Sequence, residues 1–430
     1  MSVRSRLPRG VLAAVALCAV AVAGCGSGGS GGGEAKVLNV VLVNTPWARA
    51  ITPHIPEFEK QTGIKVKLEQ YAQEQARDKI FVSLSSHSSD LDVFNVLPSN
   101  EGLKWQASGL MQPLDDDLAK AKSDYDAKGF TKTMLNASRV GGQLVGIPVN
   151  VEGPVVYYRK DVLKKYGVAV PKTLAQLVAA AQSVSQKSHG KYVTATRGMS
   201  PTVTYTFGNV LHNYGVAWTG ADGKPSFTDP RATQAIQDYA TLAGKSGPKG
   251  AVNNGPPQDS ALMASGKAAF EIDSSNELDS VVGSESSVGK KVGVMALPAG
   301  PGGSHPTLLS WNLGISKFTK HSADAWKFVQ WATSPSMMVK LAAGGIAPPR
   351  DKLWSDPTFL KPYNTPAKKE WIAAVRDIIS TGTGKVGPPA KDQDSARKVI
   401  GDEIDKVILG KETAQQASAN IQKGLTPLLS

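Results

Sequence analysis

Amide, carboxylate, guanidinium and tryptophan side chains stand at the ends of several predicted strands. Asn44 and Trp47 follow an apolar run over residues 37–43, and Arg197 follows a strand-like run over residues 192–196. Open α/β sheets place ligands beyond the carboxyl ends of their strands. The polar groups can hydrogen-bond hydroxyls, and a flat aromatic face can cover the C–H surface between them. Packing of Trp47 and a structural salt bridge for Arg197 are the alternatives.

The sequence signatures of catalysis are mostly absent or incomplete. Residues 382–387 match GxGxxG, but two prolines follow where a dinucleotide site needs a helix. HExxH, GxSxG and a complete Walker A are absent, and the six histidines are never spaced as a metal pair. The run Asp115-Asp116-Asp117 lacks the alternation of a calcium loop and is interpreted as a solvated helix start. We therefore expect no metal site and no cofactor.

Composition excludes further classes of protein. The 430 residues are 41% hydrophobic and 20% charged, which is enough for two or three domains with their own cores. The two cysteines, Cys18 and Cys25, fall near the start, so thiol chemistry in the folded body is excluded. The net charge of +12 is spread without a basic block, which argues against nucleic-acid binding.

The first residues resemble an export signal with a lipid anchor. Arg4, Arg6 and Arg9 precede a 13-residue apolar run over 11–23, shorter than the roughly 20 residues of a membrane-spanning helix. Ala-Gly-Cys then resembles a bacterial lipobox, which implies that Cys25 is acylated with fatty acids such as palmitate. The alternative is that Cys25 is one more apolar residue of the signal. We expect a signal peptide over 1–24, a flexible Gly/Ser tether over 25–35, and anchoring on the extracytoplasmic face of the cell membrane.

Strand-like and helix-like segments alternate from residue 36 onward. Strands over 37–43, 64–68 and 92–96, with a helix over 51–61, favour a mainly parallel sheet wrapped by helices. Thr173 and Gln176 predict a capping box, Asp229-Pro230 predicts another helix start, and Ser322 is expected to cap a third. Later strands are predicted over 268–272, 292–297 and 313–316. This alternation predicts two α/β lobes.

Four segments occur in an order typical of one family: 108–116 (SGLMQPLDD), 146–148 followed by 157–161, 265–270 (SGKAAF) and 325–334 (AWKFVQWATS). Together they resemble the family 1 extracellular solute-binding proteins of sugar ABC transporters. The resemblance implies a two-lobed periplasmic-binding-protein-like (type II) α/β fold that closes about a hinge with no chemical step. It places the N-terminal lobe at 36–148 and 303–344, and the C-terminal lobe at 149–302 and 345–430.

The resemblance is nearest to the sorbitol/mannitol-type binding proteins, on Arg197-Gly198, Gly208-Asn209 and residues 293–302. It implies ligand contact by Glu152, where the family crosses between lobes, with a solvated loop acid as the alternative. It also implies contact by Asn100 and Glu101, which follow the third strand. Ordinary helix capping is the alternative for that pair.

The second half adds candidates implied by the same resemblance. Trp311 and Asn312 precede a predicted strand where relatives stack a tryptophan on the sugar, with core packing as the alternative. Asp273 and Asn276 follow the strand over 268–272, where many relatives carry an aromatic residue that is missing here. Arg350 belongs to a loop that lies at the cleft in relatives, and anchoring that loop is the alternative.

We expect a receptor that delivers a sugar, sugar alcohol or short oligosaccharide to the transmembrane subunits of an ABC permease. The protein is expected to be a monomer, without enzymatic activity and without a nucleic-acid partner. A binding protein for peptide, polyamine or iron, and a secreted glycoside hydrolase, remain the alternatives.

Overall fold

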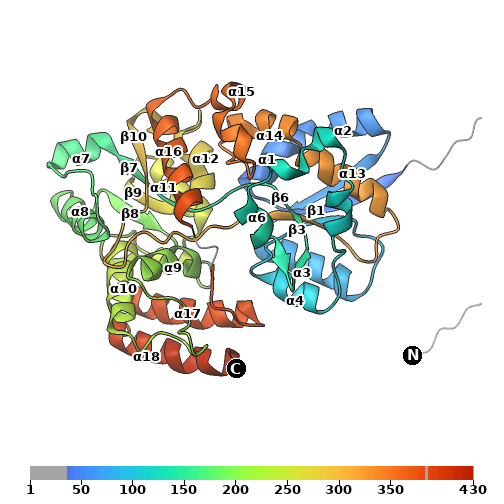
Figure 1. The fold of residues 1–430 in the computed structure, drawn as a ribbon. Coiled ribbons are helices and arrows are strands. Elements are labelled where there is room, and N and C mark those ends of the chain that lie inside the picture. Colours follow the sequence, from blue (N-terminus) through green and yellow to red (C-terminus); the bar gives the residue numbers. More distant parts are fainter. Residues whose placement is uncertain (1–35, 383–385, 430) are drawn as a thin grey trace, which may run out of the picture. The chain divides into compact units, whose positions relative to one another are not determined.

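Two β-sheets organise the chain in the computed structural model, which describes residues 36–382 and 386–429 (Figure 1). The first sheet has the strand order β2–β1–β3–β11–β6, and the second has the order β10–β7–β9–β8. We call each sheet with its helices a lobe. The signal peptide, the tether, Cys25 and part of the GxGxxG match lie outside the described residues. The strands of the two sheets are β1 (Val37–Val43), β2 (Lys65–Tyr71), β3 (Val93–Val96), β6 (Ile147–Pro148), β7 (Pro154–Arg159), β8 (Val193–Thr196), β9 (Ala268–Ser274), β10 (Val292–Ala296) and β11 (Asn312–Ile315).

The first sheet is parallel only in part. The strand β1 pairs in parallel with both β2 and β3, and its residues are mostly buried, as its apolar sequence predicts. The edge strand β2 is half-exposed, also as predicted. The prediction of a mainly parallel sheet is wrong for β11, which runs antiparallel to β3 and β6. The prediction fails there because the chain enters β11 from the second sheet. It does not reach β11 through a crossover helix of the first sheet.

Helices cover the first sheet. The strand β1 packs against α3, and β11 packs against α13. The helix predicted over 51–61 is broken by a 3₁₀ turn at Thr52–His54, and its second part ends at Gly63, whose φ of 71° favours glycine. Ser322 is the first residue of α13 and makes no cap, so that prediction is wrong. These helices are α1 (Pro46–Ile51), α2 (Ile55–Thr62), α3 (Gln73–Ser85), α4 (Glu101–Ala107), α5 (Asp115–Ala119), α6 (Lys132–Ala137), α13 (Ser322–Ala332), α14 (Pro335–Leu341) and α15 (Pro357–Leu360).

The second sheet is mostly antiparallel and carries the longer helices. Its central strand β7 is antiparallel to β10 and β9, whereas β8 and β9 are parallel. Thr173 caps α8 as predicted, but Gln176 accepts from the Lys172 amide, so the capping box is only half formed. Asp229 caps α10 as predicted. The helices are α7 (Lys160–Tyr166), α8 (Leu174–Lys187), α9 (Val203–Asn213), α10 (Pro230–Ala240), α11 (Pro256–Ala264), α12 (Leu278–Val282), α16 (Pro366–Thr381), α17 (Gln393–Ile408) and α18 (Ala414–Leu425).

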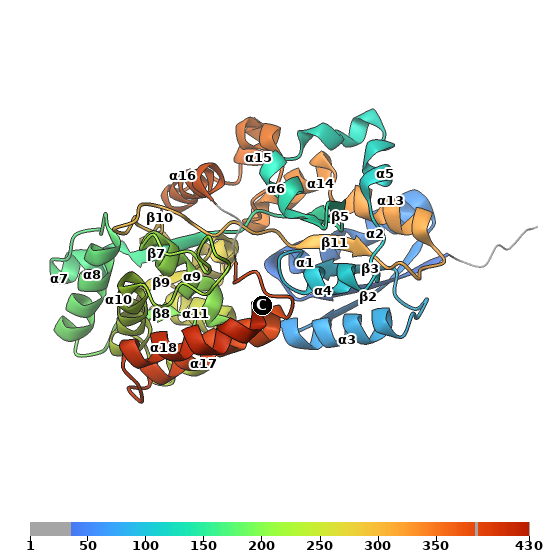
Figure 2. The ribbon, with the colours of Figure 1, turned by 60° about the horizontal axis from the view of Figure 1, so that its bottom comes forward.

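Two hydrophobic clusters underlie the lobes. One surrounds the first sheet and extends along α16, and the other joins α8, α9, α10, α17 and α18 to the second sheet. Figure 2 shows α17 and α18 side by side, and both pack against α10. The chain passes between the sheets through residues 149–153 and 297–311, and there Glu152 and Leu309 exchange backbone hydrogen bonds of 2.8 and 2.9 Å. Among the described residues, none of the helices combines the length and apolar character needed to span a bilayer.

Candidate ligand-binding site

A cavity of about 800 Å³ lies where the two lobes face each other. The first lobe contributes the starts of α1 and α3, which follow β1 and β2, and the second contributes the end of β8 with parts of α9 and α11. A volume of this size falls in the range of small-molecule sites. Its polar and aromatic lining includes Asn44, Thr45, Arg49, Glu74, Glu152, Arg197, Thr202, Tyr205, Gln258, Ser260, Asn276, Glu277, Ser280, Trp311 and Arg397.

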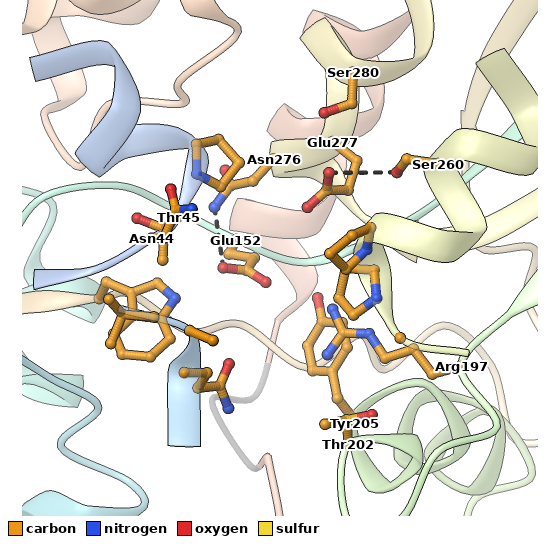
Figure 3. A pocket seen from close by; sticks show the side chains of 18 of the residues that line it. Asn44, Thr45, Glu152, Arg197, Thr202, Tyr205, Ser260, Asn276, Glu277 and Ser280 are labelled. Atoms are coloured by element: carbon orange, nitrogen blue, oxygen red, sulfur yellow. Dashed lines mark hydrogen bonds between the residues drawn. The ribbon is translucent and has the colours of Figure 1, made fainter. Parts of the chain in front are cut away.

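Glu152 occupies the crossing between the lobes. Figure 3 shows its side chain in the middle of the view, with Asn44 and Thr45 on one side and Arg197 and Tyr205 on the other. Its Oε2 accepts a hydrogen bond of 3.0 Å from Asn276 Nδ2. Burial raises the pKa of Glu152, and the nearby charge of Arg197 opposes that rise. The acid can therefore present a hydroxyl or an oxygen to a ligand.

Arg197 is held rigidly at the end of β8. Its Nε donates to both carboxylate oxygens of Asp273, at 3.0 and 3.1 Å, and its Nη2 donates to Oδ1 at 2.5 Å. The guanidinium carbon lies 4.4 Å from the centre of the Tyr205 ring. Burial alone would lower the pKa of Arg197, but the attraction of Asp273 outweighs it and raises that pKa. The pair thus brings no net charge to the cavity.

Further buried acids lie behind and beside this pair. The Ser260 hydroxyl lies 2.8 Å from Glu271 Oε1 and 3.3 Å from Glu277 Oε2, as Figure 3 shows for Glu277. Burial, followed by repulsion from Asp273, raises the pKa of Glu277 to about 7 and that of Asp259 to about 8. The pKa of Glu271 is raised for the same two reasons. Burial thus favours the protonated form of each of these three acids.

Two uncharged polar atoms in the lining have no hydrogen-bond partner among the described residues. The Tyr205 hydroxyl and Asn276 Oδ1 are both buried and make no hydrogen bond. Trp311 also lines the cavity, and its backbone N–H donates to Asn150 Oδ1 at 2.9 Å. Buried polar groups are nearly always hydrogen-bonded, so a hydroxylated ligand next to an aromatic surface fits this arrangement.

The residues predicted from the sequence divide between the cavity and other places. The structure places five of them in the lining: Asn44, Glu152, Arg197, Asn276 and Trp311. Asp273 lies behind Arg197, and Trp47 is buried in α1 with only 1% of its surface exposed. Asn312 is buried in β11, where its Nδ2 donates to the Ser310 carbonyl at 3.0 Å.

Asn100 and Glu101 line a separate crevice of about 190 Å³ beside α17. Glu101 Oε1 accepts from the Leu97 amide at 2.8 Å, and its other oxygen lies 3.2 Å from Arg77. Asn100 stands at the start of α4 without a capping hydrogen bond. The structure therefore separates this pair from Glu152.

Arg350 is buried away from the cavity lining. Its guanidinium donates to the Thr333 carbonyl at 3.2 and 2.9 Å and to the Asp126 carbonyl at 2.7 Å, and it lies 3.8 Å from the Phe130 ring centre. These contacts support the alternative that Arg350 anchors its loop.

Several lining residues were not predicted from the sequence. Thr45 caps the short helix that follows Asn44, Arg49 lies in that helix, and Glu277 directly follows Asn276, so all three could have been found by extending the predicted sites. Tyr205 and Ser260 lie within helices, where no local pattern distinguishes them. Among the described residues, no three His, Cys, Asp or Glu side chains are grouped to hold a metal ion.

The sequence profile described as "Bacterial extracellular solute-binding protein" matches residues 44–339. The chain belongs to this family. Members are substrate-binding proteins of ABC transporters that act outside the cytoplasm. Membership of the family therefore implies an extracytoplasmic location for this chain.

Similar proteins agree with this family and with the fold. A probable ABC transporter-binding protein of Deinococcus radiodurans is 27% identical over 86% of each chain. The mannitol-binding protein of Pseudomonas aeruginosa is 26% identical over 60% of this chain and 59% of its own. A solute-binding protein of Agrobacterium vitis, solved with bound D-mannitol, is 27% identical with a TM-score of 0.78, covering 91% of this chain and 98% of its own. The protein thus has the predicted two-lobed fold of the periplasmic binding proteins.

Proposed function

We propose that this family member binds a sugar or sugar alcohol in the cavity between its lobes and delivers it to an ABC permease. The observation that carries this proposal is that the Tyr205 hydroxyl and Asn276 Oδ1 have no partner among the described residues, in a cavity that Glu152 and Trp311 also line. Donors and acceptors in a cavity with an aromatic surface suit a polyhydroxyl ligand. The mannitol named for two similar proteins supports the same class of ligand.

The proposed mechanism is closure of the lobes around the ligand. Residues of both lobes line the cavity, so a ligand that touches both gains contacts in the closed state and shifts the population toward it. We propose hinge segments at 149–153 and 297–311, with lobe boundaries as predicted from the sequence except that α15 groups with the first lobe, where it packs against α14. The backbone pairing of Glu152 with Leu309 lies within these segments and supports that placement.

We propose that no bond is cleaved in this cavity. A glycosidase needs two carboxyl groups whose pKa values are pushed apart, so that one is protonated and the other ionised. Burial raises the pKa of two acids of the cavity lining, Glu152 and Glu277, so their pKa values are shifted in the same direction and not pushed apart by burial. We further propose a monomer anchored to the membrane through acylated Cys25.

Thermal unfolding of the purified protein against a ligand panel tests the proposal. The panel holds sugars, sugar alcohols, oligosaccharides, peptides, polyamines and ferric iron, and the products are analysed by chromatography. A ligand at 100 times its Kd adds about 2.7 kcal/mol to the free energy of unfolding. Stabilisation by a sugar or polyol that is recovered unchanged is the expected result. A response only to peptide, amine or iron, or the release of hydrolysis products, would contradict it.

A further inference from the structure

One buried arginine of the cavity has no hydrogen-bond acceptor among the described residues. Arg397 lies in α17, lines the cavity and is 5% exposed. Its Nε is buried without a partner, and its side chain donates no hydrogen bond within the described part of the chain. A buried charge is normally paired and hydrogen-bonded, because an unpaired one costs several kcal/mol. Arg397 is therefore in an unusual position for its residue type.

The other buried arginines of the described residues show the contrast. Arg197 is held by Asp273, Arg77 by Glu74 and Glu101, Arg159 by Asp161, and Arg350 by two backbone carbonyls. Each of these guanidinium groups has a structural partner. Arg397 lines the ligand cavity, as Arg197 does, but it differs from all four because it lacks such a partner among the described residues.

The electrostatic surroundings of Arg397 favour a bound anion. Burial, followed by repulsion from Arg77, lowers the pKa of Arg397 to about 10, so the group keeps its charge at neutral pH. Asp394 and Glu74 attract it, but neither comes within ion-pairing distance. Burial raises the pKa of Glu152 and Glu277, which favours their uncharged form and reduces their repulsion of an anion.

We propose that Arg397 binds an anionic group of the ligand, so that the solute is a polyhydroxylated acid or a phosphate ester of a polyol. This inference rests on the proposed function and narrows its substrate class. The hydroxyl groups of the ligand lie at Glu152, Asn276 and Tyr205, and its carboxylate or phosphate lies at Arg397. A planar guanidinium binds either anion through two parallel hydrogen bonds.

Matched ligands test the inference on the unmodified protein. Calorimetry compares D-glucitol, D-gluconate and D-glucitol 6-phosphate, together with the corresponding mannitol series, and the two acidic members separate a carboxylate from a phosphate. We expect one acidic member to bind at least tenfold more tightly than the neutral polyol, as charge-assisted hydrogen bonds are roughly twice as strong as neutral ones. If the neutral polyol binds as tightly or more tightly, the inference fails while the proposed function stands. If no carbohydrate or polyol binds, the proposed function itself fails and the inference with it.

Variants separate ligand binding by Arg397 from a structural role. Arg397→Met is expected to lose the preference for the acidic ligand, whereas Arg397→Lys keeps part of it. Arg231→Met is the matched control, because Arg231 is exposed and paired with Asp229 outside the cavity lining. Without ligand, Arg397→Met should unfold at the same temperature as the unmodified protein or higher, since an unpaired buried charge is removed. A lower unfolding temperature, or an unchanged ligand preference, would overturn the inference.

Discussion

Substitution of Glu277 by glutamine tests the buried acids through their effect on stability. Burial and repulsion from Asp273 raise the pKa of Glu277 from 4.5 to about 7. At about 1.4 kcal/mol per pH unit, this rise corresponds to about 3 kcal/mol. Glutamine has nearly the same shape, can still accept from Ser260, and carries no proton to lose. The substitution therefore removes the titration and leaves the packing in place.

The sign of the effect follows from proton binding. Between pH 4.5 and about 7, the unfolded chain has lost the Glu277 proton while the folded protein keeps it, so the unmodified protein loses stability as the pH rises. The loss is absent below pH 4.5 and complete above about pH 7. Relative to the unmodified protein, Glu277→Gln should gain about 3 kcal/mol between pH 4.5 and pH 8.5.

Urea unfolding of the ligand-free protein at several pH values measures this difference. Glu285→Gln is the control, because Glu285 is exposed and lies outside the cavity lining. The free energies of unfolding of Glu277→Gln and the unmodified protein should diverge with rising pH, while those of the control and the unmodified protein stay parallel. If Glu277→Gln also runs parallel to the unmodified protein, Glu277 titrates normally and the reasoning is refuted.

Three further predictions concern single side chains. Asp273→Asn should lower the free energy of unfolding by about 3 kcal/mol, because Arg197 then loses the carboxylate that pairs with it. A decrease of less than about 1 kcal/mol in urea unfolding would contradict this. Trp311→Ala should weaken ligand binding about tenfold in calorimetry with the circular dichroism of the fold retained, and normal affinity would exclude stacking. Arg350→Met should lower the free energy of unfolding by about 2 to 4 kcal/mol, because the hydrogen bonds of its guanidinium are lost. The affinity of the folded protein for the ligand should not change, and weaker binding would show that Arg350 acts at the ligand.

Local sequence signals predicted much of the secondary structure. The apolar run of β1, the cap at Thr173 and the Asp-Pro start of α10 depend on neighbouring residues, and the structure confirms all three. The direction of β11 was not predictable in this way, because it depends on a chain that leaves one sheet and returns from another. Ser322 fails as a cap because its hydroxyl donates to Gln112, which is 210 residues away in the sequence.

The same distinction applies to the site. Asn44 and Arg197 line the cavity because they follow strand ends, which is a rule that a sequence can express. Tyr205 and Arg397 line it because α9 and α17 pack together, and nothing in either helix sequence indicates which side chain reaches the cavity. Asp273 follows the end of a predicted strand, as Asn276 does. Its side chain nevertheless lies behind the cavity lining, because it pairs with Arg197.

The late arrival of β11 imposes an order on folding during synthesis. This strand lies between β3 and β6, and Asn95 in β3 bonds to a partner 217 residues later, at Asn312. At about 5 to 20 residues per second, the ribosome leaves β3 and β6 without their shared neighbour for roughly ten seconds or more. During that interval both strands expose unpaired backbone groups, so the nascent first lobe is open to chaperones and to aggregation. A chain truncated before residue 312 should remain in this incomplete state.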